Sequence, residues 1–169
     1  MKHLLILLIS IISVTSSFSQ EESTTNATTY YFIRHAEKDR SDATNKDPRL
    51  TDEGKVRAMH WSTILGQVNF DAIYSTDYNR TKETAMPVAT KNKLILTIYN
   101  PREIDAKGFI SDTEGKTVLV VGHSNTTPMF VNAIIGTKKY KNIDDSNNGN
   151  IYIVTIIDGK ISDQVLTIN

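Results

Sequence analysis

Two histidines in this sequence each come directly after a short apolar run. Arg34 and His35 follow residues 30–33, whose aromatic and β-branched side chains are typical of a buried strand. His123 follows a Gly at the end of a similar run over residues 118–121. A guanidinium gives fixed, bidentate recognition of phosphate, and an imidazole can attack or move a proton near neutral pH. Because strands of an open α/β sheet present ligand-binding residues at their carboxyl ends, we expect both histidines at one crevice; a surface position for each is the alternative.

A third candidate for anion binding is Arg80, just after a strand expected over residues 70–75. It falls in the first turn of a helix expected over residues 78–91, with Thr76 or Asp77 as the N-cap, and a cation in this turn opposes the helix dipole. Helix N-termini bind phosphate well, and an anion held there would offset that cost. Arg80 is therefore a candidate phosphate ligand, with a solvated surface Arg as the alternative.

The elements that must position these residues alternate along the chain and end in a hairpin. Further strands are expected over residues 70–75, 94–99, 117–121, 151–157 and 161–168, and helices over residues 51–66, 78–91 and 125–136. Asp158 and Gly159 between the last two strands are a strong hairpin signal. The pattern predicts an α/β fold, a three-layer α/β/α sandwich with a mostly parallel sheet and a C-terminal hairpin. Residues 39–49, which contain Asp47-Pro48, and residues 100–105 are expected to be loops, and residues 111–116 a polar turn.

The helix expected over residues 51–66 has a clear start. Thr51 is a good N-cap, and Asp52 and Glu53 suit the positive end of the dipole. The side chains expected on one face are Val56, Met59, His60, Thr63 and Ile64. His60 lies mid-helix and is interpreted as structural, because nothing nearby makes it a ligand.

Composition excludes several kinds of site. The length of 169 residues suggests one domain with a real core, and the absence of cysteine excludes disulfides, thiolate metal sites and a Cys nucleophile. The formal net charge is zero and there is no basic stripe, so no nucleic-acid partner is expected. No acidic cluster suited to a metal is evident, and neither a metal nor another cofactor is expected.

The chain begins with the pattern of an export signal. Lys2 and His3 form a short basic start, residues 4–14 are apolar, and small residues precede position 20. We predict a secretory signal peptide over residues 1–19, a flexible lead-in over residues 20–28 and one domain over residues 29–169. The mature protein is then expected to be periplasmic or secreted, without stable membrane insertion. An uncleaved anchor is the alternative, although the apolar run is short for a transmembrane span.

Four groups of residues resemble, in order, the signature of the histidine phosphatase superfamily, also called the phosphoglycerate mutase-like family. That family has Arg-His-Gly at the end of its first strand, and later strands lead to a second Arg and a second His. The matching groups here are Arg34-His35-Ala36, Leu50-Thr51 with Gly54 and Ala58, Ser75 with Arg80, Thr84 and Ala85, and Gly122-His123. They extend from about Tyr30 to Ile135, and the resemblance implies the phosphoglycerate mutase-like fold.

The resemblance also implies roles for these residues. His35 would attack phosphorus and carry the phosphoryl group, and Arg34, Arg80 and His123 would surround the phosphoryl oxygens. Phosphoryl transfer needs in-line attack, a positive cage for the oxygens and a proton for the leaving alkoxide. Hydrolysis in two steps through a phospho-histidine removes the need for a metal-activated water.

The proton donor is assigned through a further likeness. Residues 103–106 resemble the Glu-Ile-Asp-Ala stretch of the fructose-2,6-bisphosphatase branch. Glu103 is therefore expected to act as general acid and then as base for the water, with a surface Glu as the alternative. Glu37 and Asp105 are the reserve candidates.

The sequence departs from the family pattern in several places. Ala36 replaces the usual Gly, and Ser124 follows His123 where Gly is common; its hydroxyl is a candidate phosphate ligand or a helix cap. Lys38 is a further candidate phosphate ligand, and Arg40 could contact the substrate, with solvation as the alternative for both. The segment between Glu103 and the strand at residue 117 is too short for the helical cap of many relatives. The site is therefore expected to be open, as in the small phosphohistidine phosphatase branch.

These observations favour an exported phosphomonoesterase that works through a phospho-histidine on His35. The expected partner is a phosphorylated small molecule or an envelope glycan or lipid. A non-catalytic phosphate- or phosphoglycan-binding module of the same fold is the first alternative. A phosphomutase is the second, and the short segment after Glu103 argues against it, because a mutase must exclude water. The oligomeric state is left open.

Overall fold

The computed structural model describes residues 26–168. The predicted signal peptide and most of the lead-in lie outside these residues. Within the described range, no helix is both long enough and apolar enough to span a membrane.

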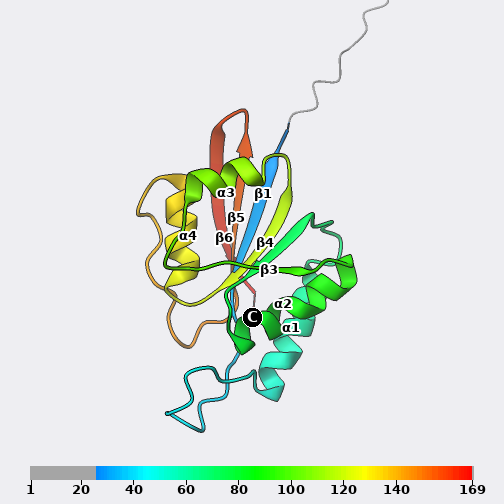
Figure 1. Ribbon diagram of the computed structural model, residues 1–169, viewed down its shortest axis with the longest axis vertical. Helices are drawn as coiled ribbons and strands as arrows, with labels where there is room; N and C mark the ends of the chain where they lie inside the picture. The colour runs from blue at the N-terminus through cyan, green and yellow to red at the C-terminus, as the bar shows by residue number, and fades with distance from the viewer. Residues whose placement is uncertain (1–25, 169) are drawn as a thin grey trace, which may run out of the picture.

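The described chain forms a six-stranded sheet with helices on both faces, as Figure 1 shows. The strands lie in the order β3-β2-β4-β1-β5-β6. In chain order the elements are β1 (Thr28–Arg34), α1 (Asp52–Ile64), β2 (Ala72–Ser75), α2 (Asn79–Asn92), β3 (Leu96–Ile98), α3 (Ala106–Asp112), β4 (Thr117–Gly122), α4 (Thr126–Ile135), β5 (Asn150–Ile157) and β6 (Lys160–Thr167).

The four strands β1 to β4 are mutually parallel, and only β5 runs the other way, since it is antiparallel to both β1 and β6. Asp158 and Gly159 both have positive φ, at 50° and 73°, which is the backbone of a two-residue type I′ turn. The predicted three-layer α/β/α architecture with a terminal hairpin is therefore confirmed.

Alternation along the central strands explains the two cores. Ile33 on β1 and Val121 on β4 face α1 and α2, where Trp61 and Val88 complete a buried cluster. Phe32 and its neighbours on the other face pack against α3 and α4. Because successive strand side chains point to opposite faces and both faces are covered, the central strands are apolar throughout.

The register of β1 and β4 decides where the site forms. Ile33 pairs with Val121 and Arg34 with Gly122, and the N–H of His35 donates to the carbonyl of Gly122 at 2.9 Å. The two histidines that follow these strands must therefore leave the sheet side by side at one edge.

Two expectations about local structure are wrong. Residues 106–112 form helix α3, where only a loop and then a polar turn were expected, and Asp105 caps it by accepting from the N–H groups of Lys107 and Gly108. Seven residues are too few to give a clear helical period. The second helix is not capped by Thr76 or Asp77; its N-cap is Tyr78, which makes no side-chain bond. Asp47, distant in sequence, accepts from the N–H of Asn79 instead, at 2.8 Å.

The face of α1 on which apolar side chains were expected is not its buried face. Val56, Met59 and Ile64 are exposed, and the side of the helix that packs inward carries Ala58 and Trp61. Small residues on this side let the helix approach the backbone that follows β1. A Cβ added to Gly54 would lie 2.2 Å from the carbonyl oxygen of Glu37. Gly54 therefore sets the distance between α1 and the segment that carries His35.

Replacing Gly54 with Ala is expected to destabilise the protein by about 1–3 kcal/mol, because the new methyl group overlaps backbone that cannot rotate away. Chemical denaturation measures the change. Lys55→Ala is the matched control, since Lys55 is exposed in the same turn and only pairs with Asp52 at the surface. Equal stability of Gly54→Ala and the native protein would show that this contact does not position α1.

Candidate active site

His35 is buried at the end of β1, with only 3% of its surface exposed. Its Nδ1 lies 2.7 Å from the carbonyl oxygen of Ala36. A carbonyl can only accept, so Nδ1 carries the proton and Nε2 keeps its lone pair. Burial lowers the pKa of His35 from 6.5 to about 3, and the nearby His123, Arg34 and Arg80 act in the same direction. Near neutral pH the imidazole is therefore uncharged and able to attack through Nε2.

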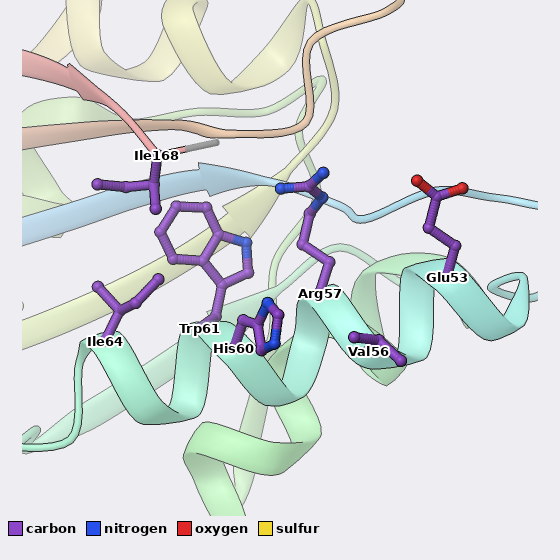
Figure 2. Close-up of a pocket in the computed structure, with 7 residues that line it drawn as sticks. All are labelled: Glu53, Val56, Arg57, His60, Trp61, Ile64 and Ile168. Carbon is purple, nitrogen blue, oxygen red and sulfur yellow. The ribbon is translucent and has the colours of Figure 1, made fainter.

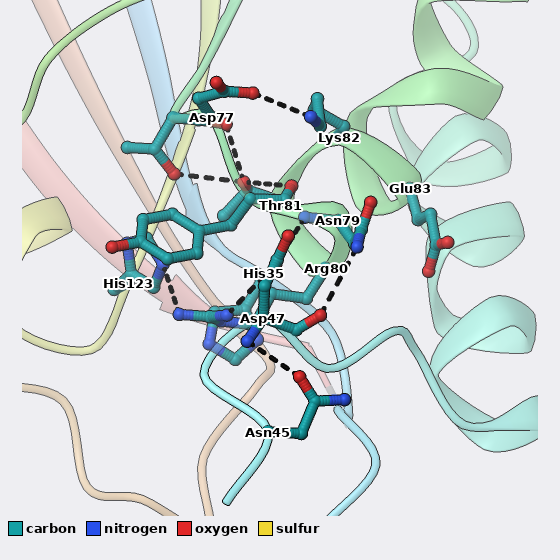
Figure 3. A network of polar contacts seen from close by, with 12 residues as sticks. His35, Asn45, Asp47, Asp77, Asn79, Arg80, Thr81, Lys82, Glu83 and His123 are labelled. Carbon is teal, nitrogen blue, oxygen red and sulfur yellow. Dashed lines mark hydrogen bonds and ion pairs between the residues drawn. The ribbon is translucent and has the colours of Figure 1, made fainter.

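His123 lies across from His35, with ring centroids 5.4 Å apart and the planes at 73°. Arg80 donates from Nη2 to Nε2 of His123 at 3.0 Å, so the proton of this second imidazole is on Nδ1. Burial lowers the pKa of His123 to about 4, and the next largest cause is the charge of Arg80. The ring of Tyr78 covers the guanidinium of Arg80 at 4.3 Å. Figure 3 shows His35, Arg80 and His123 gathered in one network.

Arg80 is buried, with only 8% of its surface exposed, and not all of its N–H groups have an acceptor. Its Nε and Nη1 are buried without a hydrogen-bond partner among the described residues. The carboxylate of Asp47 is an ion-pair partner of Nη1 at 3.6 Å, a distance beyond a hydrogen bond. Two buried N–H groups without an acceptor in the protein are suited to binding an anion, because such donors are costly unless they are paired.

Asp47 is a residue that the sequence did not single out. It supplies the negative charge that a cation in the first turn of α2 requires, and it is 42% exposed on its side chain. Its carboxylate both caps the helix and faces Arg80, as Figure 3 shows. The Asp47-Pro48 pair predicts only a loop, and nothing in its local sequence indicates a partner 33 residues away.

Arg34 is held differently from the expectation. Its Nη1 donates to the carbonyl oxygens of Asp144, Asp145 and Asn147, and its Nη2 contacts the carboxylate of Asp145 at 2.7 Å. Only Nε is buried without a partner in the described part of the chain. The two-pronged phosphate grip expected of Arg34 cannot form while the loop over residues 144–147 takes both terminal nitrogens. Arg34 can offer one N–H to an anion, and it also fixes this loop.

The same loop region reaches the backbone of His35. Asn148 is buried, and its side-chain amide donates to the carbonyl of His35 at 2.7 Å. Thr84 on α2 also binds the backbone next to His35. Its hydroxyl accepts from the N–H of Ala36 at 2.9 Å and donates to the carbonyl of Arg80 at 2.7 Å. The Thr of the sequence signature thus links the two segments that carry the candidate nucleophile and the candidate phosphate ligand.

A cavity of about 300 Å³ opens beside His35. Lys38, Glu37 and Arg40 line it together with His35. Oε1 of Glu37 accepts from Arg57 at 2.6 Å, and its Oε2 is buried without a partner in the described range. The structure therefore brings Lys38 and one reserve carboxyl to the candidate nucleophile.

The other candidates do not line this cavity. Glu103 and Asp105 line a separate cavity of about 240 Å³ between the loop after β3 and the aromatic rings of α3 and α4. Asp105 is occupied as the cap of α3. Ser124 is half-buried after His123, and its carbonyl accepts from the N–H of Ile143 at 2.8 Å. No contact of Glu103 or of the Ser124 hydroxyl with His35 is present in residues 26–168, and their assigned roles stay predictions.

His60 is on the exposed side of α1 and does not line the cavity that contains His35. It borders a cavity of about 280 Å³ with Arg57, Trp61 and Ile168. Figure 2 shows its ring beside these side chains. Among the described residues, no group of three His, Asp or Glu side chains is arranged to hold a metal there or elsewhere.

Comparison with known families agrees with this arrangement. The model of the histidine phosphatase superfamily (branch 1) matches residues 30–109, which contain Arg34, His35 and Arg80. The resemblance to the histidine phosphatase superfamily is confirmed. No curated protein matches the sequence of this histidine phosphatase-like chain.

Solved structures share its fold. A putative phosphohistidine phosphatase from Agrobacterium tumefaciens is 14% identical, with 83% of this chain and 99% of that chain covered and a TM-score of 0.60. A phosphoserine phosphatase mutant from Entamoeba histolytica, in complex with phosphoserine, is 17% identical over 81% and 95%, with a TM-score of 0.62. A phosphoglycerate mutase from Bacillus anthracis is 18% identical over 84% and 93%, with a TM-score of 0.62. At these identities the likeness shows the phosphoglycerate mutase-like fold.

Acid is expected to destabilise the protein through the two buried imidazoles. Unfolded chains protonate histidine near pH 6.5, whereas in the folded state the pKa of His35 is about 3 and that of His123 about 4. The unfolded state therefore binds more protons below pH 6.5, and each ring is expected to cost roughly 2 kcal/mol at pH 5. Thermal unfolding at pH 7 and pH 5 measures the loss. It should shrink in His123→Asn and persist in His60→Asn, and an equal loss in both variants would contradict the assignment.

Thr84→Val is expected to lower stability by about 1–3 kcal/mol, because the buried N–H of Ala36 loses its acceptor. The matched control is Thr63→Val, since the Thr63 hydroxyl also donates to a carbonyl four residues back but is exposed on α1. Urea denaturation compares the two. A Thr84→Val protein as stable as Thr63→Val would show that the link between β1 and α2 is weak.

Proposed function

We propose that this protein is an exported phosphomonoesterase that hydrolyses phosphate esters through a phospho-histidine on His35. The proposal rests on one observation: the uncharged, buried imidazole of His35 lies in the same site as buried N–H groups that lack acceptors. Nε2 of His35 has a lone pair, and Nε and Nη1 of Arg80 have no hydrogen-bond acceptor in residues 26–168. A tetrahedral dianion supplies the acceptors, and a nucleophile beside it completes the requirements for phosphoryl transfer.

The proposed reaction has two steps. Nε2 of His35 attacks phosphorus, the P–N bond forms, and the ester P–O bond breaks to release the alcohol once its oxygen has taken a proton from a carboxyl. Water then gives a proton to the same carboxylate and attacks phosphorus, the P–N bond breaks, and the imidazole and the carboxyl return to their starting states with release of inorganic phosphate. Arg80, His123 and Nε of Arg34 stabilise the oxygens in both steps. His123 donates to them once it is protonated or has turned from Arg80.

The protein is proposed to act outside the cytoplasm on a phosphorylated small molecule or on an envelope glycan or lipid. The support is the signal-like sequence of residues 1–19 and the open rim of the cavity. The segment between β3 and β4 contains only the seven-residue helix α3 and does not form a cap. This favours hydrolysis over phosphomutase activity, which requires exclusion of water.

Hydrolysis of an aryl phosphate in the presence of EDTA tests the central claim. The native protein should turn over without added metal, and His35→Ala should lose at least about a thousandfold in rate, because the nucleophile is absent. His60→Ala is the control, since His60 is exposed on α1. Base-quenched native protein should carry a phosphoryl group on His35. Equal rates for His35→Ala and the native protein would exclude the mechanism, and binding without a labelled histidine would favour a non-catalytic module.

The proton donor can be identified by comparing substrates whose leaving groups differ in their need for a proton. Glu37 lies in the cavity with His35, and Glu103 in another, so the geometry supports Glu37. Glu37→Gln is expected to slow hydrolysis of an alkyl phosphate by about 10²–10⁴-fold. It should slow an aryl phosphate much less, because a phenolate needs no proton to leave. The same pattern in Glu103→Gln, with none in Glu37→Gln, would restore the assignment made from the sequence.

A further inference from the structure

The cavity beside His35 has a lining that restricts the alcohol part of a substrate. Every residue that lines it is polar or charged, and four are cations: Arg34, Lys38, Arg40 and Arg57. An aromatic or acyl group would find no apolar surface there, because burial of apolar area requires apolar partners. The cavity therefore favours a hydrophilic leaving group, and an aryl phosphate is expected to bind through its phosphoryl group rather than through its ring.

Two of these cations are held in place by backbone pairing. Lys38 forms an isolated β-bridge with Leu50, and the N–H of Asp39 donates to the carbonyl of Arg49 at 2.9 Å. Lys38 and Arg40 are two residues apart on this extended segment, and both line the cavity. Their positions are therefore fixed by the fold more firmly than those of residues on a free loop.

Lys38 has no anionic partner. Its ammonium group forms no hydrogen bond or ion pair with any residue in the described part of the chain, whereas Arg57 is paired with Glu37 at 2.6 Å. Burial lowers the pKa of Lys38, and the charges of Arg80 and Arg40 lower it further. The ammonium group of Lys38 thus lies near the guanidinium groups of Arg80 and Arg40, and the opposing charge of Asp145 compensates it only in part.

The protein already binds one carboxylate at this place. Oδ1 of Asp145 lies 2.7 Å from Nη2 of Arg34, and its Oδ2 lies 2.8 Å from Nη2 of Arg40. One carboxylate therefore spans the gap between the Arg that precedes His35 and Arg40. The side chain of Asp145 is 69% exposed, so a competing anion can reach Arg40 from solvent and displace the carboxylate of Asp145.

We propose that Lys38 and Arg40 form a subsite for a second anionic group on the alcohol part of the substrate. The inference rests on the proposed function and deepens it: the substrates are small hydrophilic phosphate monoesters that carry a carboxylate or a second phosphate. Because a single carboxylate bridges Arg34 and Arg40, the second anion lies only a few bonds from the phosphorus. Asp145 occupies part of this subsite when no substrate is bound and leaves Arg40 when the second anion arrives.

Three esters with the same three-carbon skeleton test the subsite. Glycerol phosphate has a neutral far end, phosphoglycerate has a carboxylate there, and glycerol bisphosphate has a second phosphate. Their dissociation constants are measured by calorimetry on His35→Ala, which binds without turnover. Either anionic ester is expected to bind about tenfold more tightly than glycerol phosphate. The comparison of the two anionic esters shows which group the subsite prefers.

Substitutions with opposite expected effects test the role of each residue in the subsite. In the His35→Ala background, Arg40→Gln and Lys38→Met should each reduce the preference for the anionic esters about tenfold. Asp145→Asn should increase it several-fold, because the competing carboxylate is removed and Arg34 keeps its three carbonyl partners. Lys160→Gln is the control, since it removes one charge at the β5–β6 turn, at the opposite end of the sheet. An increase cannot arise from misfolding.

The outcomes separate the subsite from the catalytic proposal. Equal binding of the three esters, or a preference unchanged by Arg40→Gln and Lys38→Met, would overturn the subsite. Hydrolysis of all three with equal kcat/KM by the native protein would keep the phosphatase and exclude the second anion site. The predicted binding pattern without any hydrolysis would keep the subsite and contradict the enzyme.

Discussion

The parallel register of β1 with β4 is the constraint on which the site depends. Arg34 pairs with Gly122, and the N–H of His35 donates to that Gly, so two segments 88 positions apart end at one place. A shift of one residue would turn His35 or His123 toward the other face of the sheet. The apolar faces of both strands are buried under helices, and this burial is what prevents such a shift. The chemistry of the site is therefore secured by packing behind it.

The positive charges around His35 and His123 are not fully neutralised by the protein's own side chains. Arg80 and Arg34 are buried with N–H groups that lack acceptors among the described residues, and the two imidazoles stay uncharged. Asp47 and Asp145 supply partial compensation from loops. A bound phosphate group accepts from the remaining donors. Because leaving these donors unpaired costs free energy, the site is selective for a dianion.

The sequence predicted the fold and the meeting of the histidines because both follow from short-range patterns. Apolar runs mark the strands, Asp158-Gly159 marks the hairpin, and parallel strand ends converge by geometry. It failed where a partner is distant in the chain. The capping of α2 by Asp47 and the clamp of Arg34 by residues 144–147 depend on loops that no periodicity describes. Glu103 was assigned through a likeness of four residues, and the loop that carries it leads to another cavity.

One oxyanion is proposed to bind between His35, Arg80 and His123. A crystal structure with vanadate, which takes the geometry of a phosphoryl group in transfer, examines this arrangement atom by atom. Vanadium should be bonded to Nε2 of His35, with vanadate oxygens within hydrogen-bond distance of Arg80 and His123. Vanadate bound at another place, or His35 left without a bond to it in a fully occupied site, would rule out this oxyanion site.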